Sequence, residues 1–290
     1  MPSRVQYAIG GTGDCVRARL LVPRRRRDFL QWQPRIDPRP NPSYNAVMKI
    51  KIISCEALAR EFYLAAASSP HVIDTELLAF GLHNTPDDLR AAIQAAIDLS
   101  EGKGYHAIIL GYGLCSRGTA GIRARSIPIV IPRMHDCITA FLGSRARYSA
   151  EFAAQPGTYY YSPGWIERKE GDVDQGFIDI HEKMYSERYA EYVRKYGEDN
   201  AKFLIEQEQQ WYANYTRAAF IDMGMGAVDQ YRRFTSELAR ERGWEYVELC
   251  GNMSLVERLA NGDWDSEDFL VIQPGHSIAE SFDDLILKED

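Results

Sequence analysis

The sequence lacks a long apolar run, and this absence limits where the protein can act. No stretch approaches the roughly 18 apolar residues that a membrane-spanning helix needs, so we expect no transmembrane helix and no membrane partner. A secretory signal also needs an apolar segment of about 7–15 residues behind its basic end. The first 47 residues contain no such segment. These absences predict a cytoplasmic protein.

Lysine and glutamate are missing from residues 1–47. Nine arginines and three aspartates give this part a net charge of +6, which leaves −13 for the rest of a chain whose total is −7. Four prolines between Pro34 and Pro42 oppose a helix there. We interpret residues 1–47 as a disordered basic extension outside the fold, upstream of a true start at Met48. A basic arm that binds nucleic acid is the alternative, but the acidic body predicts no nucleic-acid partner.

Cysteine is scarce, and its spacing matches no familiar motif. Five cysteines are widely and irregularly spaced, and neither CxxC nor HExxH occurs. Without a secretory signal, a disulfide framework is not expected. Metal binding, nucleophilic catalysis and simple burial remain open for these side chains, and the spacing does not identify a metal.

Strand and helix patterns alternate from Met48 onward. Apolar segments predict strands over 49–55, 72–80, 106–113 and 127–132, with helices over 56–67, 85–101 and 135–152 between or after them. The alternation returns after residue 216, with strands over 217–224, 244–251 and 268–275 and helices over 228–243 and 253–262. Such β/α units predict parallel sheets covered by helices.

A different pattern separates the two β/α regions. Residues 156–215 begin with an aromatic strand and turn and continue as a long polar segment, which predicts two helices that break near Gly197. The predicted fold is therefore α/β, with two Rossmann-like parallel-sheet halves at 48–155 and 216–290 separated by a helical insert.

Most of the reactive side chains fall where predicted strands end. In open parallel sheets, ligands bind beyond the carboxyl ends of the strands. Cysteine and histidine residues occupy these ends at Cys55, Cys115, His135, Cys137, Cys250 and His276. Thiolate and imidazole are the usual ligands of zinc and also suit iron. We therefore predict a metal site formed by Cys55, Cys115, Cys137 and His276, with zinc preferred over iron or an iron–sulfur cluster.

Three residues that lie next to the predicted cysteine ligands in the sequence are expected to carry catalytic roles. His135 is expected to act as a proton carrier or a further ligand, and Asp136 and Glu56 are expected to orient it or to move a proton. The start of a helix at Cys137 predicts a lowered thiol pKa. The remaining four histidines, which lie at predicted loop or helix positions, are expected to be solvated: His71, His83, His106 and His181.

Arginine is concentrated in the same region. Six arginines and a single acid, Asp136, lie between residues 117 and 147. Guanidinium groups bind carboxylates and phosphates, so an anionic small molecule is expected, held by Arg133 and Arg117. Tyr160 and Trp165 are candidates for a pocket wall, with core packing as the alternative.

The segment GYGLCSRG resembles a nucleotide loop only superficially. Its glycines do not follow the spacing of the dinucleotide fingerprint, and no Walker lysine follows. We expect these glycines to let the backbone approach a ligand, or to let Cys115 project from a tight turn.

Several motifs together resemble one protein family. GYGLCSRG, PRMHDC, LGSRARY and GTYYYSPGWIE are similar to the family known as domain of unknown function 1638, and the resemblance runs from Met48 to about His276. Cys55, Cys115, His135 and Cys137 lie in matching segments, whereas Cys250 departs from the pattern. The resemblance implies a family found in bacteria and methanogenic archaea, with some members encoded beside corrinoid-dependent methyl-transfer proteins. It implies no established reaction.

Three functions follow from these observations. The first is a metal-dependent enzyme that acts on a small anionic substrate, with methyl or thiol transfer as its reaction. The second is a metal- or corrinoid-binding accessory protein of a methyl-transfer system, whose partners would be corrinoid or methyltransferase proteins. The third is a metal-free enzyme with a cysteine nucleophile and His135 as its base.

Overall fold

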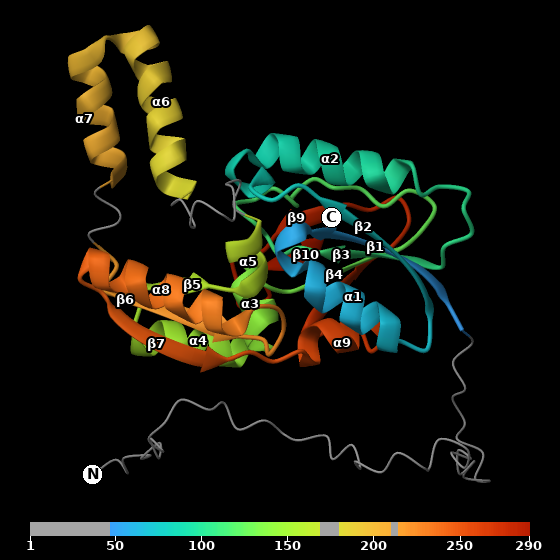
Figure 1. The fold of residues 1–290 in the computed structure, drawn as a ribbon. Helices are drawn as coiled ribbons and strands as arrows, with labels where there is room; N and C mark the ends of the chain where they lie inside the picture. Colours follow the sequence, from blue (N-terminus) through green and yellow to red (C-terminus); the bar gives the residue numbers. More distant parts are fainter. Residues whose placement is uncertain (1–46, 169–179, 210–213) are drawn as a thin grey trace, which may run out of the picture. The chain divides into compact units, whose positions relative to one another are not determined.

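The computed structural model describes residues 47–168, 180–209 and 214–290 as a mixed α/β fold (Figure 1). The predicted extension over residues 1–47 lies outside this part of the chain, apart from Val47. Among the described residues, no helix is both long and apolar enough to cross a membrane.

A five-stranded sheet forms the larger core. Its strands lie in the order β2 (Val72–Leu78), β1 (Lys49–Cys55), β3 (Ala107–Gly111), β4 (Ile129–Pro132) and β8 (Phe269–Ile272). The first four strands are parallel, and β8 pairs with β4 in the antiparallel direction. Because four strands share one direction, their carboxyl ends meet at a single edge of the sheet.

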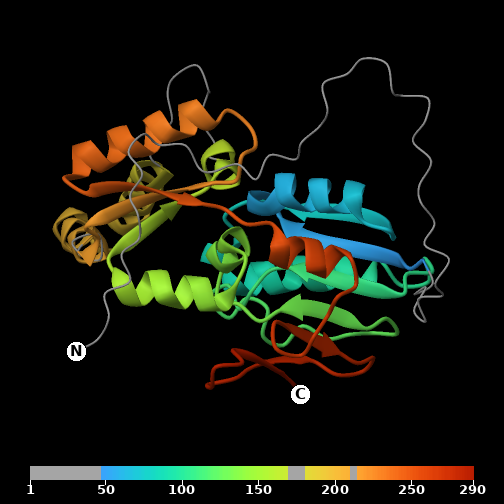
Figure 2. The same cartoon turned by 90° about the horizontal axis from the view of Figure 1, so that it is seen from below.

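Helices cover both faces of this sheet (Figures 1 and 2). On one face, α2 (Pro86–Asp98) packs its apolar side on alternate residues of the strands. On the other face lie α1 (Ala59–Ser68), α3 (Cys137–Leu142) and α9 (Ser254–Ala260). The central strand β3 is buried along its whole length, as expected of a parallel strand covered on both faces.

A second, three-stranded parallel sheet has the order β5 (Thr158–Tyr161), β6 (Arg217–Asp222) and β7 (Glu245–Cys250). Helix α8 (Val228–Arg242) packs on one face of it. Helix α4 (Arg145–Ala154) contacts β5 and β6 through Tyr148 and Glu151. A separate antiparallel pair is formed by β9 (Ile278–Glu280) and β10 (Leu287–Glu289).

The strand partners differ from the predicted division into two halves. The sequence pattern assigns β5 to the insert, but β5 pairs with β6, and it assigns β8 to the second half, but β8 completes the first sheet. Both sheets are predominantly or wholly parallel, yet they are not built from the separate segments 48–155 and 216–290. Local hydrophobic patterns identify strands but carry little information on which strands pair across long sequence distances.

Several helix boundaries also differ from the predictions. The helix expected over 135–152 is two helices, α3 and α4, because Gly143 adopts a left-handed conformation and ends α3. The predicted break at Gly197 is confirmed by α6 (Ile180–Tyr196) and α7 (Glu198–Gln209). Three short helices complete the fold: η1 (Glu56–Leu58), η2 (Leu82–Asn84) and α5 (Pro163–Glu167).

Candidate functional site

A cavity of ≈ 930 Å³ lies at the carboxyl ends of β1 to β4 and is closed on another side by β5 and α5. Its volume is within the range of small-molecule sites in proteins. Eight of the residues predicted for a site line it: Cys55, Cys115, Arg117, His135, Asp136, Cys137, Tyr160 and Trp165. Strand direction therefore brings together side chains that are far apart in the sequence.

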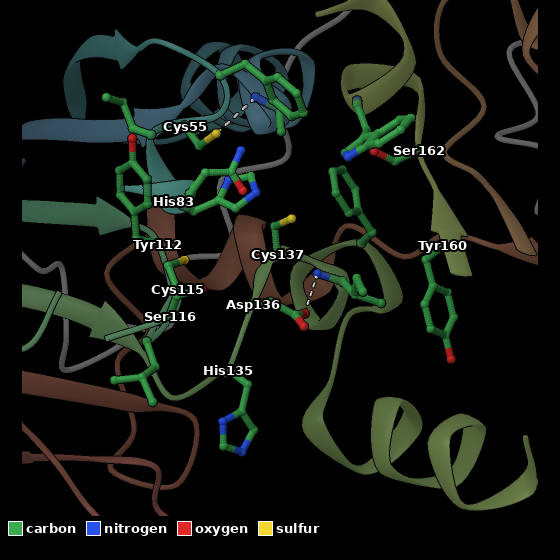
Figure 3. A pocket seen from close by; sticks show the side chains of 18 of the residues that line it. Cys55, His83, Tyr112, Cys115, Ser116, His135, Asp136, Cys137, Tyr160 and Ser162 are labelled. Atoms are coloured by element: carbon green, nitrogen blue, oxygen red, sulfur yellow. Dashed lines mark hydrogen bonds between the residues drawn. The ribbon is translucent and has the colours of Figure 1, made fainter. Parts of the chain in front are cut away.

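The three thiols reach the cavity from three different strand ends. Cys55 ends β1 and caps η1, where its Sγ atom accepts a hydrogen bond from the Ala57 N–H at 3.5 Å. Cys115 follows β3, and Cys137 begins α3 after β4. In Figure 3 the three sulfur-bearing side chains lie around one part of the cavity, whereas the His135 ring points away from them. All three are free cysteines.

Burial keeps these thiols protonated. It raises the pKa of Cys55, raises that of Cys115 to about 12, and raises that of Cys137 well above its ordinary value. The negative charge of Asp136 raises the pKa of Cys137 further, and ionisation of Cys55 or Cys115 would raise it again. The lowered pKa predicted for Cys137 is therefore wrong, because burial outweighs the influence of the six-residue helix α3.

The turn after β3 has an unusual backbone. Cys115, Ser116 and Arg117 have φ angles of 45°, 55° and 70°, three consecutive non-glycine residues in the left-handed region. Each such residue costs about 1–2 kcal/mol. The turn is stabilised by hydrogen bonds from the Gly118 N–H to the Cys115 carbonyl and from the Thr119 hydroxyl to the Gly113 carbonyl, both of 2.9 Å. Strain of this kind is concentrated at functional sites.

Gly111 and Gly113, which precede the turn, let neighbouring chain segments pack closely, and neither of them forms part of the turn. A Cβ atom at Gly113 would lie 2.4 Å from the Met134 carbonyl oxygen, and one at Gly111 would lie 2.3 Å from the Ser54 hydroxyl oxygen. Neither glycine has a positive φ angle. Cys115 lies in a tight turn, as one of the two expected roles of these glycines requires, but Gly111 and Gly113 bring neighbouring chain segments together, and the positive φ angles belong to non-glycine residues.

Asp136 combines a structural role with a place in the cavity. Its Oδ1 atom caps α3 by accepting a hydrogen bond from the Ile138 N–H at 2.9 Å, and its Oδ2 atom lies 3.4 Å from the Tyr148 hydroxyl. Burial raises the pKa of Asp136 despite these bonds. The neighbouring His135 is exposed, and its carbonyl oxygen accepts the Cys115 N–H. Its ring faces away from the sulfurs, so this conformation does not show the predicted proton transfer to a thiol.

Two cavity residues are not recognisable from the sequence pattern. His83 in η2 is expected to be solvated, but it lines the cavity, its ring lies 6.1 Å from that of Phe80, and burial lowers its pKa. Tyr112 is 4% exposed, and its hydroxyl has no hydrogen-bond partner within the described residues. Burial raises the pKa of Tyr112. The sequence does not identify His83 because it lies in a predicted loop, and it does not identify Tyr112 because it lies in an apolar segment typical of a core strand.

Three predicted residues do not line the cavity. Glu56 accepts a hydrogen bond from the Phe80 N–H at 3.0 Å and lies 3.7 Å from Arg168. Arg133 is buried and donates hydrogen bonds to the carbonyl oxygens of Ser266, Phe269, Leu285 and Leu287, so its guanidinium group holds the C-terminal segments together. His276 follows the antiparallel strand β8 and lies 3.6 Å from Glu289.

The opposite direction of β8 explains the position of His276. In the antiparallel direction, the carboxyl end of β8 lies at the amino ends of the parallel strands, away from the cavity. The structure therefore does not bring His276 to the three thiols. The expectation that every strand end meets at one edge fails for this strand.

The remaining predicted residues line different parts of the cavity. Arg117 pairs with Glu280 at 2.9 Å, and its side chain is 68% exposed. Tyr160 lies in β5 (Figure 3). Its ring lies 6.2 Å from that of Tyr148. Trp165 packs edge-on against Tyr161 at a ring separation of 5.0 Å. The last two residues thus combine core packing with a position on the cavity wall.

Within the ranges that the structure describes, no three histidine, cysteine, aspartate or glutamate side chains stand close enough together to hold a metal ion. The three thiols line the same cavity without forming such a group.

Comparison with known proteins identifies one family. A family model described as "Protein of unknown function (DUF1638)" matches residues 77–260. The match includes Cys115, His135 and Cys137 and begins after Cys55. No curated protein and no solved structure matches the chain.

Proposed function

Since the chain belongs to the DUF1638 family, whose function is unknown, we propose a function from the cavity: a metal-dependent enzyme that acts on a small anionic molecule. The observation that carries this proposal is that three free thiols, Cys55, Cys115 and Cys137, line the wall of one cavity.

The raised pKa values of the thiols argue against nucleophilic attack without a metal ion. Neutral thiols are poor nucleophiles, and burial raises the pKa of all three. A bound metal ion reverses this effect, because its charge stabilises thiolates and releases their protons. Zinc suits three thiolates with one position left open, the arrangement of a catalytic zinc site.

The shape of the cavity leaves room for a substrate beside the ion. Aromatic side chains from β5 and α5 form one wall, and the polar turn at Cys115 forms another. A bound zinc ion would supply Lewis-acid activation of a thiol or water, which suits methyl or thiol transfer. His83, whose pKa is lowered by burial, is the neutral imidazole available to accept a proton.

A metal-free cysteine nucleophile is the second candidate. One observation favours it: the Cys55 sulfur accepts the Ala57 N–H, a bond that favours the thiolate. In that case His83 would take the proton of the Cys55 thiol, and the thiolate would bond to an electrophilic carbon of the substrate as the substrate's leaving group departs with the bonding electron pair and receives that proton from His83. The accessory role with corrinoid or methyltransferase partners stays a prediction.

Metal analysis separates the two candidates. The protein, purified anaerobically and incubated with zinc, is dialysed and its metal content measured by plasma mass spectrometry. We expect about one zinc per chain in the wild type and a large loss in Cys115→Ser and Cys137→Ser. His276→Ala is the matched control, because that residue is a predicted ligand but lies outside the cavity, and it should retain zinc. Zinc-free wild-type protein would overturn the metal proposal.

A further inference from the structure

We propose that Glu56 is the positioning residue of His83: its carboxylate holds the loop 79–84, and with it the imidazole of His83, at the cavity wall. This inference rests on the proposed function, in which His83 is the proton acceptor. The sequence predicts that Glu56 orients a histidine, and the structure assigns that role toward His83 in place of His135.

Glu56 joins three segments that contribute to the cavity. It follows Cys55 directly and begins η1. Its Oε2 atom accepts a hydrogen bond of 3.0 Å from the Phe80 N–H, in the loop 79–84. Its Oε1 atom lies 3.7 Å from the guanidinium group of Arg168, which follows α5. One carboxylate therefore contacts the end of β1, the loop and the end of α5.

The loop depends on this bond because its own backbone hydrogen bonds are local. The Asn84 N–H donates to the Gly81 carbonyl oxygen at 2.9 Å, and the Thr85 N–H donates to the Leu82 carbonyl oxygen at 3.0 Å. These two bonds close η2 on itself. The Glu56 carboxylate, by contrast, ties the loop to the segment that follows β1.

The Phe80 side chain extends the restraint to His83. Its ring lies edge-on to the His83 ring, with 6.1 Å between the centroids, and edge-on to the Trp165 ring at 6.2 Å. Edge-to-face contacts favour one relative orientation of two rings. Among the described residues, the structure shows no hydrogen bond to a ring nitrogen of His83. Ring packing therefore orients the imidazole and leaves both of its nitrogens to a ligand.

This position gives His83 the properties of a base. His83 lines the cavity together with Cys55 (Figure 3). Burial lowers the pKa of His83, so its neutral form is available to accept a proton. Release of the loop would expose the ring to water and remove the cause of the lowered pKa. Because Glu56 does not line the cavity, it acts through the loop and not on a substrate.

Modification by diethylpyrocarbonate, which acylates neutral imidazoles, tests the assignment. Metal-free protein is treated at about neutral pH, and mass spectrometry of the digest measures the rate at each histidine. Glu56→Ala removes the acceptor of the Phe80 N–H and should raise the rate at His83 by about tenfold. Glu56→Gln keeps an acceptor oxygen and should show the wild-type rate. An equal rate at His83 in wild type and Glu56→Ala would overturn the inference.

Two controls separate release of the loop from loosening of the whole fold. His71, which contacts Met48 and Asn261 outside the loop, is the internal reference and should react at one rate in every protein. Glu76→Ala removes a carboxylate that is 37% exposed, against 31% for Glu56, and that pairs with Lys51 at 2.7 Å. This variant should leave His83 unchanged. Equal increases at His71 and His83 in Glu56→Ala would refute a local role.

A second variant tests the step from the loop to the imidazole. Phe80→Leu keeps the backbone N–H that Glu56 accepts and removes the aromatic ring that packs on His83. It should also raise the rate at His83 and leave His71 unchanged. An unchanged rate at His83 would show that Phe80 does not hold the imidazole, and the inference would fail.

The two proposals fail separately, because the modification rates are measured without zinc. Faster modification of His83 in Glu56→Ala supports the positioning role even in protein that never binds zinc. An unchanged rate rejects that role and leaves the zinc measurement as it stands.

Discussion

The backbone N–H of Cys115 donates a 2.9 Å hydrogen bond to the carbonyl oxygen of His135. This bond joins the loop after β3 to the loop after β4, and a second bond of 2.8 Å from Leu114 to Met134 lies beside it. The two loops that carry Cys115 and Cys137 are therefore fixed to each other by the backbone. A change in either loop is expected to move both thiols.

Relief of backbone strain provides the first test of the turn. Ser116→Gly removes the side chain from a residue with a φ angle of 55° and should raise the free energy of unfolding by about 0.5–1 kcal/mol, because glycine tolerates this conformation. Urea denaturation measures the change. Ser266→Gly is the control, since Ser266 is exposed and is not among the residues with a positive φ angle. An unchanged or lower stability in Ser116→Gly would show that the turn is not strained.

A close contact near α5 provides the second prediction. A Cβ atom at Gly164 would lie 1.9 Å from the Ala57 carbonyl oxygen, so Gly164→Ala must push α5 away from η1. We expect a loss of about 2–3 kcal/mol in the free energy of unfolding. Gly102→Ala is the matched control: its φ angle of +72° opposes alanine, but nothing lies within 4 Å of the new Cβ atom. The free energy of unfolding of Gly102→Ala should fall by only about 1–2 kcal/mol. Equal losses in the two variants would contradict the close contact at Gly164.

A buried carboxyl group in α1 predicts a pH dependence of stability. Glu61 is 0% exposed, both of its carboxyl oxygens lack a hydrogen-bond partner among the described residues, and burial raises its pKa from 4.5 to about 7. Between about pH 4.5 and 7 the folded protein therefore binds more protons than the unfolded protein. Protonated Glu61 therefore contributes to the stability of the folded protein at low pH. This contribution is lost as the pH rises, and the free energy of unfolding falls by about 3 kcal/mol in total.

The substitution Glu61→Gln isolates this effect. Denaturation of wild type and variant at pH 5 and pH 8 should show that the variant gains stability relative to wild type as the pH rises. Glu241→Gln, at an exposed position of α8, is the control and should follow the wild type. The same difference between Glu61→Gln and wild type at both pH values would show that Glu61 does not titrate in this range.

Alkylation provides a test of the buried thiols. Because burial raises the pKa of Cys115 to about 12, its reaction with iodoacetamide in metal-free protein should be slow at pH 7 and should still accelerate above pH 9. Mass spectrometry of the digested protein measures the rate at each cysteine. Glutathione, alkylated in the same tube, provides the ordinary thiol for comparison. A rate at Cys115 that levels off below pH 8 would contradict the raised pKa.

The sequence by itself determined the local elements and the group of reactive residues. Apolar periodicity located β1 at its observed bounds, and the break at Gly197 follows from the conformational freedom of glycine. Because parallel strands end at one edge of a sheet, the strand pattern alone predicts that Cys55, Cys115 and Cys137 lie near one another. These features depend on short-range interactions and on strand direction, which a pattern in the sequence records.

Only the tertiary structure decided which strands pair and how each side chain is surrounded. The antiparallel pairing of β8 removed His276 from the cavity, and the carbonyl oxygens of distant segments occupied Arg133. Long-range packing also buried His83 and raised the pKa of Cys137, where a helix start alone favours a lower value. Pairing and burial depend on contacts between residues far apart in the chain, so no local pattern specifies them.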